Sequence, residues 1–226
     1  MLKTLMTVIC LTVGLMTSSA YASVQANSAG WEKYGELTFR VSEQTGVPVM
    51  DLVALMSMES GLEADAKNGE GSTAGGLGSM TKPTFKTMVK RYGKQYGIKP
   101  GTSRFNARAN LYMTAAYWKE NTSILSKKLN RPVTREEGYM AHLLGPITAA
   151  KVIKSKNNRA AWKVAGVNPN ANKKFFMKGS RKTGYRARTV GEFKSYVNAE
   201  MNRHAKAYRP YATLTAFQYN YHLVDA

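Results

Sequence analysis

The chain has 226 residues, of which 43% are hydrophobic and 10% aromatic, so it can bury one core but is short for two full domains. Its formal charge of +19 predicts an anionic partner. A single cysteine excludes a disulfide within the chain.

The first residues have the pattern of a secretory signal peptide. Lys3 supplies a positive start, Leu5 to Met16 is a short apolar run, and Ala20 to Ala22 offers small residues for cleavage. We therefore expect a signal peptide over 1–22, a linker over 23–30, and export to the periplasm or cell envelope. The apolar run is shorter than the roughly 20 residues that cross a bilayer, which leaves an uncleaved anchor as the lesser alternative.

Metal-binding patterns are missing from the sequence. Cys10 lies inside the predicted signal, and His142, His204 and His222 share no ligand spacing with cysteines or carboxylates. We expect no metal and no other cofactor.

Two helices are predicted near the start of the mature chain. Trp31 to Gln44 carries apolar residues at helical spacing, and Val49 to Ser60 follows the break at Pro48. The next segment, Lys67 to Gly78, is too rich in glycine for regular structure, so we expect a loop or a short irregular sheet there.

The middle of the chain predicts three more helices. Apolar residues from Leu111 to Leu129 recur at intervals of three, four and seven, which indicates a long central helix. Thr134 to Glu137 is a capping box that opens a short helix, and Gly145-Pro146 closes it and starts the next.

The C-terminal part is strongly basic. Between Lys151 and Arg209 there are sixteen basic residues and two acidic ones. Asn168 to Arg188 predicts a loop or hairpin, and a helix follows from about Val190 to Tyr208. We expect one mainly α domain over 31–210, with a small irregular or β loop region, and a tail over 211–226.

Glu59 is the strongest catalytic candidate. It alone among the 14 carboxylates closes an amphipathic helix directly before a glycine-rich loop. It shares a helix face with Leu52 and Leu55, and such burial disfavours ionisation of a carboxyl. A carboxyl kept partly protonated can donate a proton to a glycosidic oxygen. The plainer alternative is a solvated or ion-paired residue at a helix end.

Four ordered segments resemble the soluble lytic transglycosylase family, in the style of phage-encoded cell-wall enzymes. Ser42 to Gly61 resembles its opening, in which the catalytic glutamate stands in a Glu-Ser-Gly triplet. Ala74 to Met80 is similar to its glycine-leucine-methionine-glutamine segment. Tyr139 to Pro146 is similar to its third motif, in the Ala-His-x-x-Gly-Pro form, and Thr189 to Val197 to its last motif, which ends in a tyrosine, here Tyr196.

This resemblance implies a mainly α, lysozyme-like domain that cleaves peptidoglycan between N-acetylmuramic acid and N-acetylglucosamine and leaves a 1,6-anhydro end. Glu59 would act as acid and then as base, so no second carboxylate is required. A water-adding muramidase remains the alternative if Asp65 or Glu70 folds back, at roughly 6.5–9.5 Å from Glu59 in an inverting enzyme. A chitinase-like relative is a further alternative.

The resemblance also implies substrate-contacting residues, although two of its segments depart from the family pattern. Gly78 and Ser79 replace the methionine and glutamine of the second motif, and His142-Leu143 replaces a tyrosine-asparagine pair. A catalytically weak wall-binding protein therefore stays open. Ser60 has a second interpretation, in which it ties down the helix end. The substrate-binding candidates are Ser60, Leu77, Ser79, Met80, Tyr139, His142 and Tyr196.

The basic stretch 151–209 has two interpretations. It is either a solvated surface or a binding surface for anionic envelope polymers, or for a secretion or phage machinery. Basic and aromatic residues alternate most closely between Lys173 and Arg188. We find no nucleic-acid motif, so we expect no specific nucleic acid as a partner.

Overall fold

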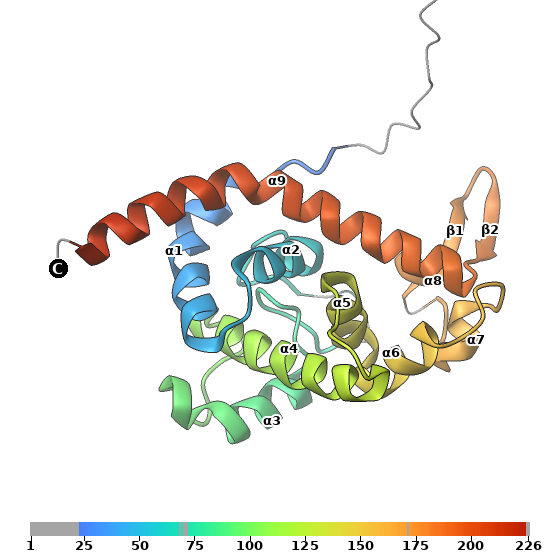
Figure 1. Cartoon of the computed structure of the whole chain (residues 1–226), viewed down its shortest axis with the longest axis horizontal. Helices are drawn as coiled ribbons and strands as arrows, with labels where there is room; N and C mark the ends of the chain where they lie inside the picture. Colours follow the sequence, from blue (N-terminus) through green and yellow to red (C-terminus); the bar gives the residue numbers. More distant parts are fainter. Residues whose placement is uncertain (1–22, 68, 70–71, 171, 225–226) are drawn as a thin grey trace, which may run out of the picture.

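The computed structural model describes residues 23–67, 69, 72–170 and 172–224 (Figure 1). The predicted signal peptide lies outside these residues. No helix in the described part is long and apolar enough to cross a membrane. The elements in chain order are α1 (Ser28–Thr45), α2 (Val49–Ser60), α3 (Lys82–Tyr92), the 3-10 helix η1 (Lys94–Tyr96), α4 (Ala107–Leu129), α5 (Arg135–Leu144), α6 (Pro146–Ile153), α7 (Ala161–Ala165), α8 (Lys173–Phe176), β1 (Met177–Ser180), β2 (Gly184–Ala187) and α9 (Val190–Val224).

Helix α2 is the centre of the fold. Figure 1 shows it enclosed by α1, α4, α5 and α9, and it packs most extensively against α9. Five consecutive residues, from Leu52 to Met56, are completely buried. A helix that is apolar on nearly every side belongs in a core, and α2 meets this condition over its first two turns.

Local signals set several boundaries where the sequence predicted them. Helix α2 ends at Gly61, which has a φ of 62° in the left-handed region that glycine favours. The capping box of α5 forms fully, because the Thr134 hydroxyl accepts from the Glu137 N–H and the Glu137 carboxylate accepts from the Thr134 N–H. Helix α6 starts at Pro146 as predicted.

The folded unit begins before the predicted boundary at residue 31. Helix α1 starts at Ser28, because the Asn27 side chain accepts from the Gly30 N–H and caps the helix. The Asn27 N–H also donates to the Tyr208 hydroxyl at 2.8 Å. Residues 27–30, which we expected in a linker, therefore belong to the domain.

Helix α3 has no counterpart in our prediction. Thr81 caps it, and a proline lies in its first turn. Its buried residues Phe85, Met88 and Val89 follow helical spacing. These signals are present in the sequence, and the 3-10 helix η1 follows directly.

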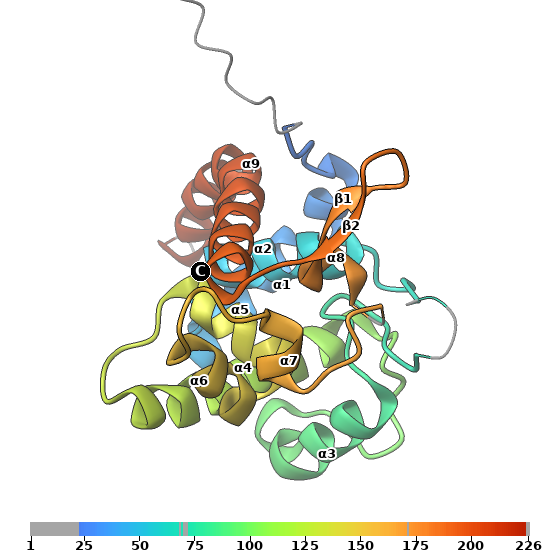
Figure 2. The ribbon, with the colours of Figure 1, turned by 90° about the vertical axis from the view of Figure 1, so that its right-hand side faces the viewer.

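The segments without helix are small, as predicted. The glycine-rich loop forms two isolated antiparallel bridges, Lys67 with Gly75 and Gly75 with Met80. Strands β1 and β2 make a two-stranded antiparallel hairpin, in which Met177 pairs with Ala187. Figure 2 shows the hairpin projecting from the body.

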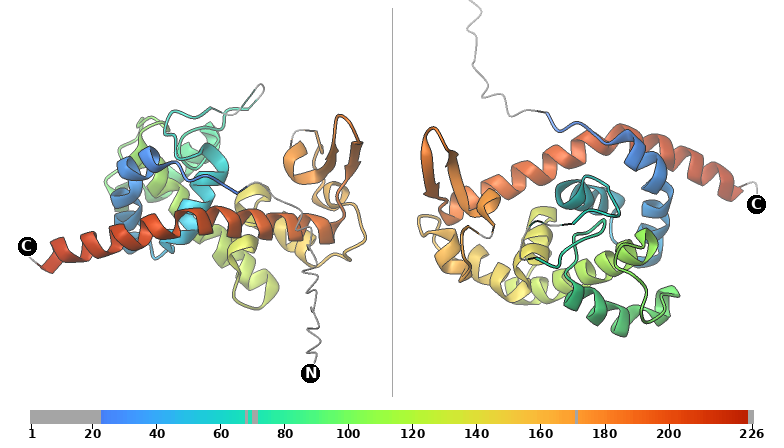
Figure 3. Two further views of the ribbon diagram at one scale, coloured as in Figure 1. Left: turned by 90° about the horizontal axis from the view of Figure 1, so that it is seen from above. Right: turned by 180° about the vertical axis from the view of Figure 1, so that it is seen from behind.

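Helix α9 is longer than predicted, and the expected tail over 211–226 is helical as far as Val224. Pro210 lies inside the helix, where it removes one backbone donor and usually costs stability. Contacts with α1 offset this cost: Ala212 is buried, and the Trp31 indole N–H donates to the Thr215 hydroxyl at 2.9 Å. Figure 3 shows α9 running the length of the molecule.

Candidate active site

Glu59 occupies the last turn of α2 and is half-buried. The Tyr139 hydroxyl on α5 donates to its Oε1 at 2.6 Å. Within the described residues, Oε2 accepts no hydrogen bond. One carboxyl oxygen is thus fixed by the protein, and the other is free to act on a bound molecule.

Tyr139 is completely buried and stays protonated. Burial raises its pKa well above the usual value, and the negative charges of Glu59 and Glu200 act in the same direction. A phenol in this state donates its hydrogen bond and does not titrate near neutral pH. We predicted Tyr139 as a substrate contact, whereas the structure places its hydroxyl on Glu59.

His142 lies beside Tyr139 on α5. The two rings stack with centroids 6.2 Å apart, and Tyr117 meets the imidazole edge-on at 5.7 Å. Burial lowers the pKa of His142, against the opposing effects of Glu59 and a backbone hydrogen bond with Gly78. The ring is therefore neutral at pH 7 and packs Tyr139 in place.

The glycine-rich loop is tied to the end of α2 by Ser60. Its hydroxyl contacts the Met56 carbonyl at 3.0 Å and the Leu77 carbonyl at 2.8 Å. This geometry favours the second interpretation of Ser60, in which it fixes the helix end. The Leu77 side chain is completely buried, so Leu77 takes part in this contact through its backbone carbonyl alone.

Ser79 is the partly exposed residue within the buried run from Ala74 to Met80. Its φ of 48° lies in the left-handed region, an unfavourable conformation for a residue with a side chain, and such residues occur often at functional sites. Its hydroxyl forms no hydrogen bond within the described residues. Met80, in contrast, is only 2% exposed and offers little surface to a sugar ring.

Asn110 on α4 organises this loop, and sequence reasoning missed it. The fully buried amide accepts from the Gly78 N–H at 2.8 Å and donates to the carbonyls of Gly75 and Arg104. The contacts with Gly78 and Gly75 span more than 30 residues along the chain, so no local pattern reveals them.

The departure at Gly78 has a steric explanation. A Cβ at this position would lie 2.1 Å from Oγ1 of Thr114 on α4. Thr114 is completely buried, so the space for a longer side chain at position 78 is filled. Glycine at 78 and threonine at 114 therefore fit as a pair.

Tyr196 on α9 lies at the other end of an aromatic row. Phe175 of α8 contacts Tyr139 at 5.8 Å and Tyr196 at 6.1 Å between ring centroids. The Arg188 guanidinium lies over the Tyr196 ring at 4.0 Å. The predicted residues Tyr139, His142 and Tyr196 thus form one continuous row beside Glu59, with Phe175 as the link that the sequence did not indicate.

The structure brings a second carboxylate, Glu200 of α9, close enough to raise the pKa of Tyr139. Glu200 is 4% exposed and pairs with Arg203 at 2.5 Å, so its charge is balanced inside the protein. Asp65, which the sequence offered as a second acid for a muramidase, is exposed, as is the neighbouring Glu63. Glu70 lies outside the described residues.

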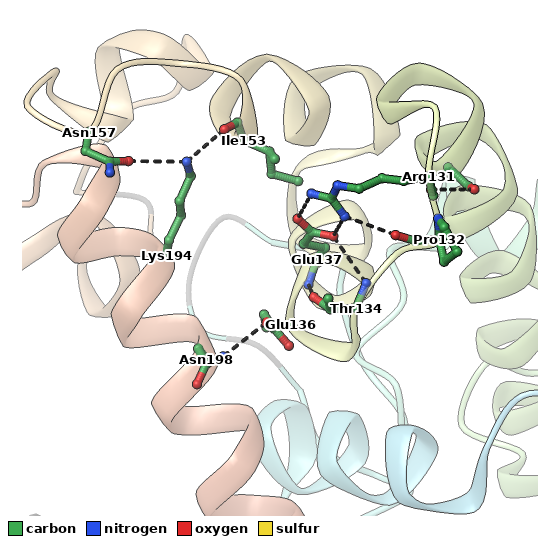
Figure 4. A network of polar contacts seen from close by, with 10 residues as sticks. Arg131, Pro132, Thr134, Glu136, Glu137, Ile153, Asn157, Lys194 and Asn198 are labelled. Carbon is green, nitrogen blue, oxygen red and sulfur yellow. Dashed lines mark hydrogen bonds and ion pairs between the residues drawn. The ribbon is translucent and has the colours of Figure 1, made fainter.

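The outer face of α5 carries a polar network that fixes this helix (Figure 4). Arg131 forms two hydrogen bonds with Glu137 and lowers the pKa of that carboxyl. Lys194 of α9 donates to the carbonyl of Ile153 and to Asn157. The Arg131–Glu137 pair anchors the first turn of α5, the helix that also carries Tyr139, whereas Lys194 joins α9 to the end of α6.

The described residues form a mostly helical domain with Glu59 at the end of its buried central helix. Residues 36–165 match the family model of the transglycosylase SLT domain, and this family match confirms the predicted lysozyme-like fold. The match covers more than half of the chain, and the protein belongs to this family. The family is one of lytic enzymes that act on peptidoglycan, and the match includes Glu59, the glycine-rich loop and α5.

Proposed function

We propose that the protein is a lytic transglycosylase that cuts the β-1,4 bond between N-acetylmuramic acid and N-acetylglucosamine in peptidoglycan. The observation that carries this proposal is Glu59, held through Oε1 by Tyr139 at 2.6 Å and adjoining the loop of Ser79. In this proposal the chain is exported and works in the periplasm or cell envelope, where its substrate is found.

The reaction needs one carboxyl in two roles. Glu59 first donates its proton through Oε2 to the leaving glycosidic oxygen. It then accepts the proton of the muramic 6-hydroxyl as this group attacks the anomeric carbon, so the bond to the leaving sugar breaks and the 1,6-anhydro ring closes. Tyr139 keeps its own proton and fixes the carboxyl plane during both transfers.

Neighbouring residues would orient the sugar. The Ser79 hydroxyl is free to bind an N-acetyl group, and its backbone conformation is fixed by the Ser79 N–H bond to the Gly76 carbonyl. Tyr196, which is partly buried, offers a ring edge at the end of the aromatic row. Neutral His142 supports Tyr139 and does not supply a second acid.

The test is digestion of purified peptidoglycan by the protein and by Glu59→Gln, with mass analysis of the products. We expect anhydro-muropeptides, and a loss of at least about a thousandfold in the variant at unchanged melting temperature. Reducing ends with oxygen from labelled water would identify a hydrolytic muramidase instead. Wall binding without any release would favour a non-enzymatic protein.

Tyr139→Phe tests the positioning of Glu59. Removing one hydrogen bond to the carboxyl should lower kcat about tenfold with KM unchanged, since the hydroxyl does not face the substrate. Tyr117→Phe is the matched control, because Tyr117 contacts His142 and not Glu59. Equal losses in both variants would contradict the assigned role of Tyr139.

A further inference from the structure

The segment Lys173–Arg188, here called the basic hairpin, comprises α8, β1, β2 and the turn between the strands. It carries seven lysine and arginine residues and no carboxylate. It begins after residue 165, where the family match ends. The matched family model therefore does not include this concentration of charge.

The basic hairpin is attached directly to the active site. Its residue Phe175 contacts Tyr139, the residue that holds Glu59, and Arg188 covers Tyr196. Figures 2 and 3 show the hairpin and the glycine-rich loop projecting on the same side of α9. The base of the hairpin therefore borders the site, on the same side of α9 as the loop that carries Ser79.

Charge inside the hairpin region is only partly balanced. Lys178 and Arg186 share one carboxylate, Glu192, at 3.6 and 2.5 Å. Arg181 and Lys182 at the tip are exposed and pair with no carboxylate of the described residues. Two cations at the tip are thus available to a ligand.

The turn that carries them is ordered by its own hydrogen bonds. The Ser180 N–H donates to the Thr183 hydroxyl at 3.0 Å, and the Thr183 N–H donates to the Ser180 hydroxyl at 3.2 Å. A preformed turn loses less conformational entropy when it binds than a flexible segment does. This favours a ligand-binding role over a solvated surface loop.

We infer that the basic hairpin binds the carboxylates of the peptide stems that hang from the substrate glycan, so that stem-bearing strands are cleaved faster than naked ones. This inference rests on the proposed function. The sugar chain offers no free carboxylate beside the bond that is cut, because the lactyl acid of the muramic residue is joined to the stem. The stems carry free carboxylates, and they leave the strand at the sugar that Glu59 would act on.

The experiment compares Arg181→Gln/Lys182→Gln with Lys127→Gln/Lys128→Gln. The second pair is exposed in the last turn of α4 and removes the same charge elsewhere. Substrates are intact peptidoglycan and glycan from which an amidase has removed the stems, with the lactyl carboxylates that this hydrolysis releases converted to uncharged methyl amides. We expect the tip variant to lose about three- to tenfold in cleavage rate on intact peptidoglycan only, and the control variant to lose nothing.

Binding is measured separately in the Glu59→Gln background, by sedimentation with the same two substrates. Stem-dependent binding that the tip substitutions weaken supports the inference even if no cleavage occurs, so failure of the proposed function is recognised on its own. Equal weakening on both substrates, or none on either, would overturn it. Weakening that disappears after hydrogen fluoride removes phosphate-linked polymers from the wall would assign the cations to those polymers instead.

Discussion

Two irregular segments adjoin Glu59, and they are held in opposite ways. The glycine-rich loop is fixed from inside by the fully buried amide of Asn110, which serves three backbone groups. The basic hairpin is anchored at its base by the buried rings of Phe175 and Phe176, whereas its strands are held by exposed ion pairs with Glu192 and by their turn. Buried hydrogen bonds are costly to lose, whereas exposed ion pairs contribute little.

The two kinds of anchor suit two different tasks: one segment positions groups next to Glu59, and the other presents positive charge to a ligand. The loop must hold backbone groups and Ser79 in one geometry next to Glu59, and a buried anchor achieves this. The hairpin must present cations to water, and paired cations there cost little to rearrange. Four predictions test or extend this contrast, and their expected effects decrease in turn.

Asn110→Ala should have the largest effect. It leaves the Gly78 N–H and the carbonyls of Gly75 and Arg104 without their partner, so we expect a loss of about 3 to 4 kcal/mol in the free energy of unfolding and at least tenfold in cleavage. Denaturant unfolding and peptidoglycan digestion measure both. Asn202→Ala is the control, because Asn202 is exposed on α9 and its amide donates, among the described residues, only to Asn198 of the same helix. Unchanged cleavage in a destabilised variant would show that the loop does not set the site.

His204 should make stability depend on pH. Burial lowers its pKa to about 4, aided by Lys174 of the hairpin region and Arg203 and opposed by Glu200. The unfolded chain binds this proton from about pH 6.5 downward and the folded chain does not, so the free energy of unfolding falls by about 2 to 3 kcal/mol between pH 6.5 and 4.

The measurement is urea unfolding at several pH values, with His204→Asn as the comparison. Asparagine keeps an acceptor for Ser57, which lies 2.6 Å from Nδ1 of His204, but it does not titrate. The free energy of unfolding of the variant should not show this decrease between pH 6.5 and 4. An identical dependence on pH in both proteins would rule out His204 as its source.

Gly78→Ala should cost about 1 to 2 kcal/mol, because the new Cβ would clash with the Thr114 hydroxyl. Thr114→Ala removes the clashing atom. The double variant should therefore be more stable than the sum of the two single losses predicts, and a thermal unfolding cycle measures this coupling. Strict additivity would argue against the paired fit of these two positions.

Glu192→Gln should have the smallest effect. It releases Lys178 and Arg186 of the basic hairpin, yet all three side chains are substantially exposed. We expect a change of no more than about 3 °C in Tm. The freed cations should leave binding to stem-bearing peptidoglycan equal or stronger, and weaker binding would mean that the pairs hold the hairpin in its active shape.

Sequence signals predicted most of the fold where they are local. Gly61 ends α2, the Thr134 box starts α5, and Pro146 starts α6, because each of these residues acts within one turn. The predicted end of α9, at about Tyr208, was wrong, since the helix continues through Pro210 to Val224. Contacts with Asn27 and Trp31, more than 180 residues away in sequence, support the helix near and beyond the proline.

The sequence predicted the central residue of the candidate site, but it predicted fewer of the contacts that hold this residue in place. Glu59 stood out by its place at a helix end, and the motif resemblance indicated Tyr139, His142 and Tyr196. Their mutual contacts, and the roles of Asn110 and Glu200, arise only when α2, α4, α5 and α9 meet. Contacts between different helices leave no residue pattern within any one segment, so the sequence did not predict them.

Helix α9 has a consequence for proteolysis of the chain. It covers α2, the helix that carries Glu59, and it packs against α2 more extensively than against any other helix. A cut ahead of Val190 that releases α9 would expose the apolar side of α2 that it covers, and the Asn27 contact with Tyr208 would be lost. Cleavage between the basic hairpin and α9 would therefore inactivate the site without touching Glu59 itself.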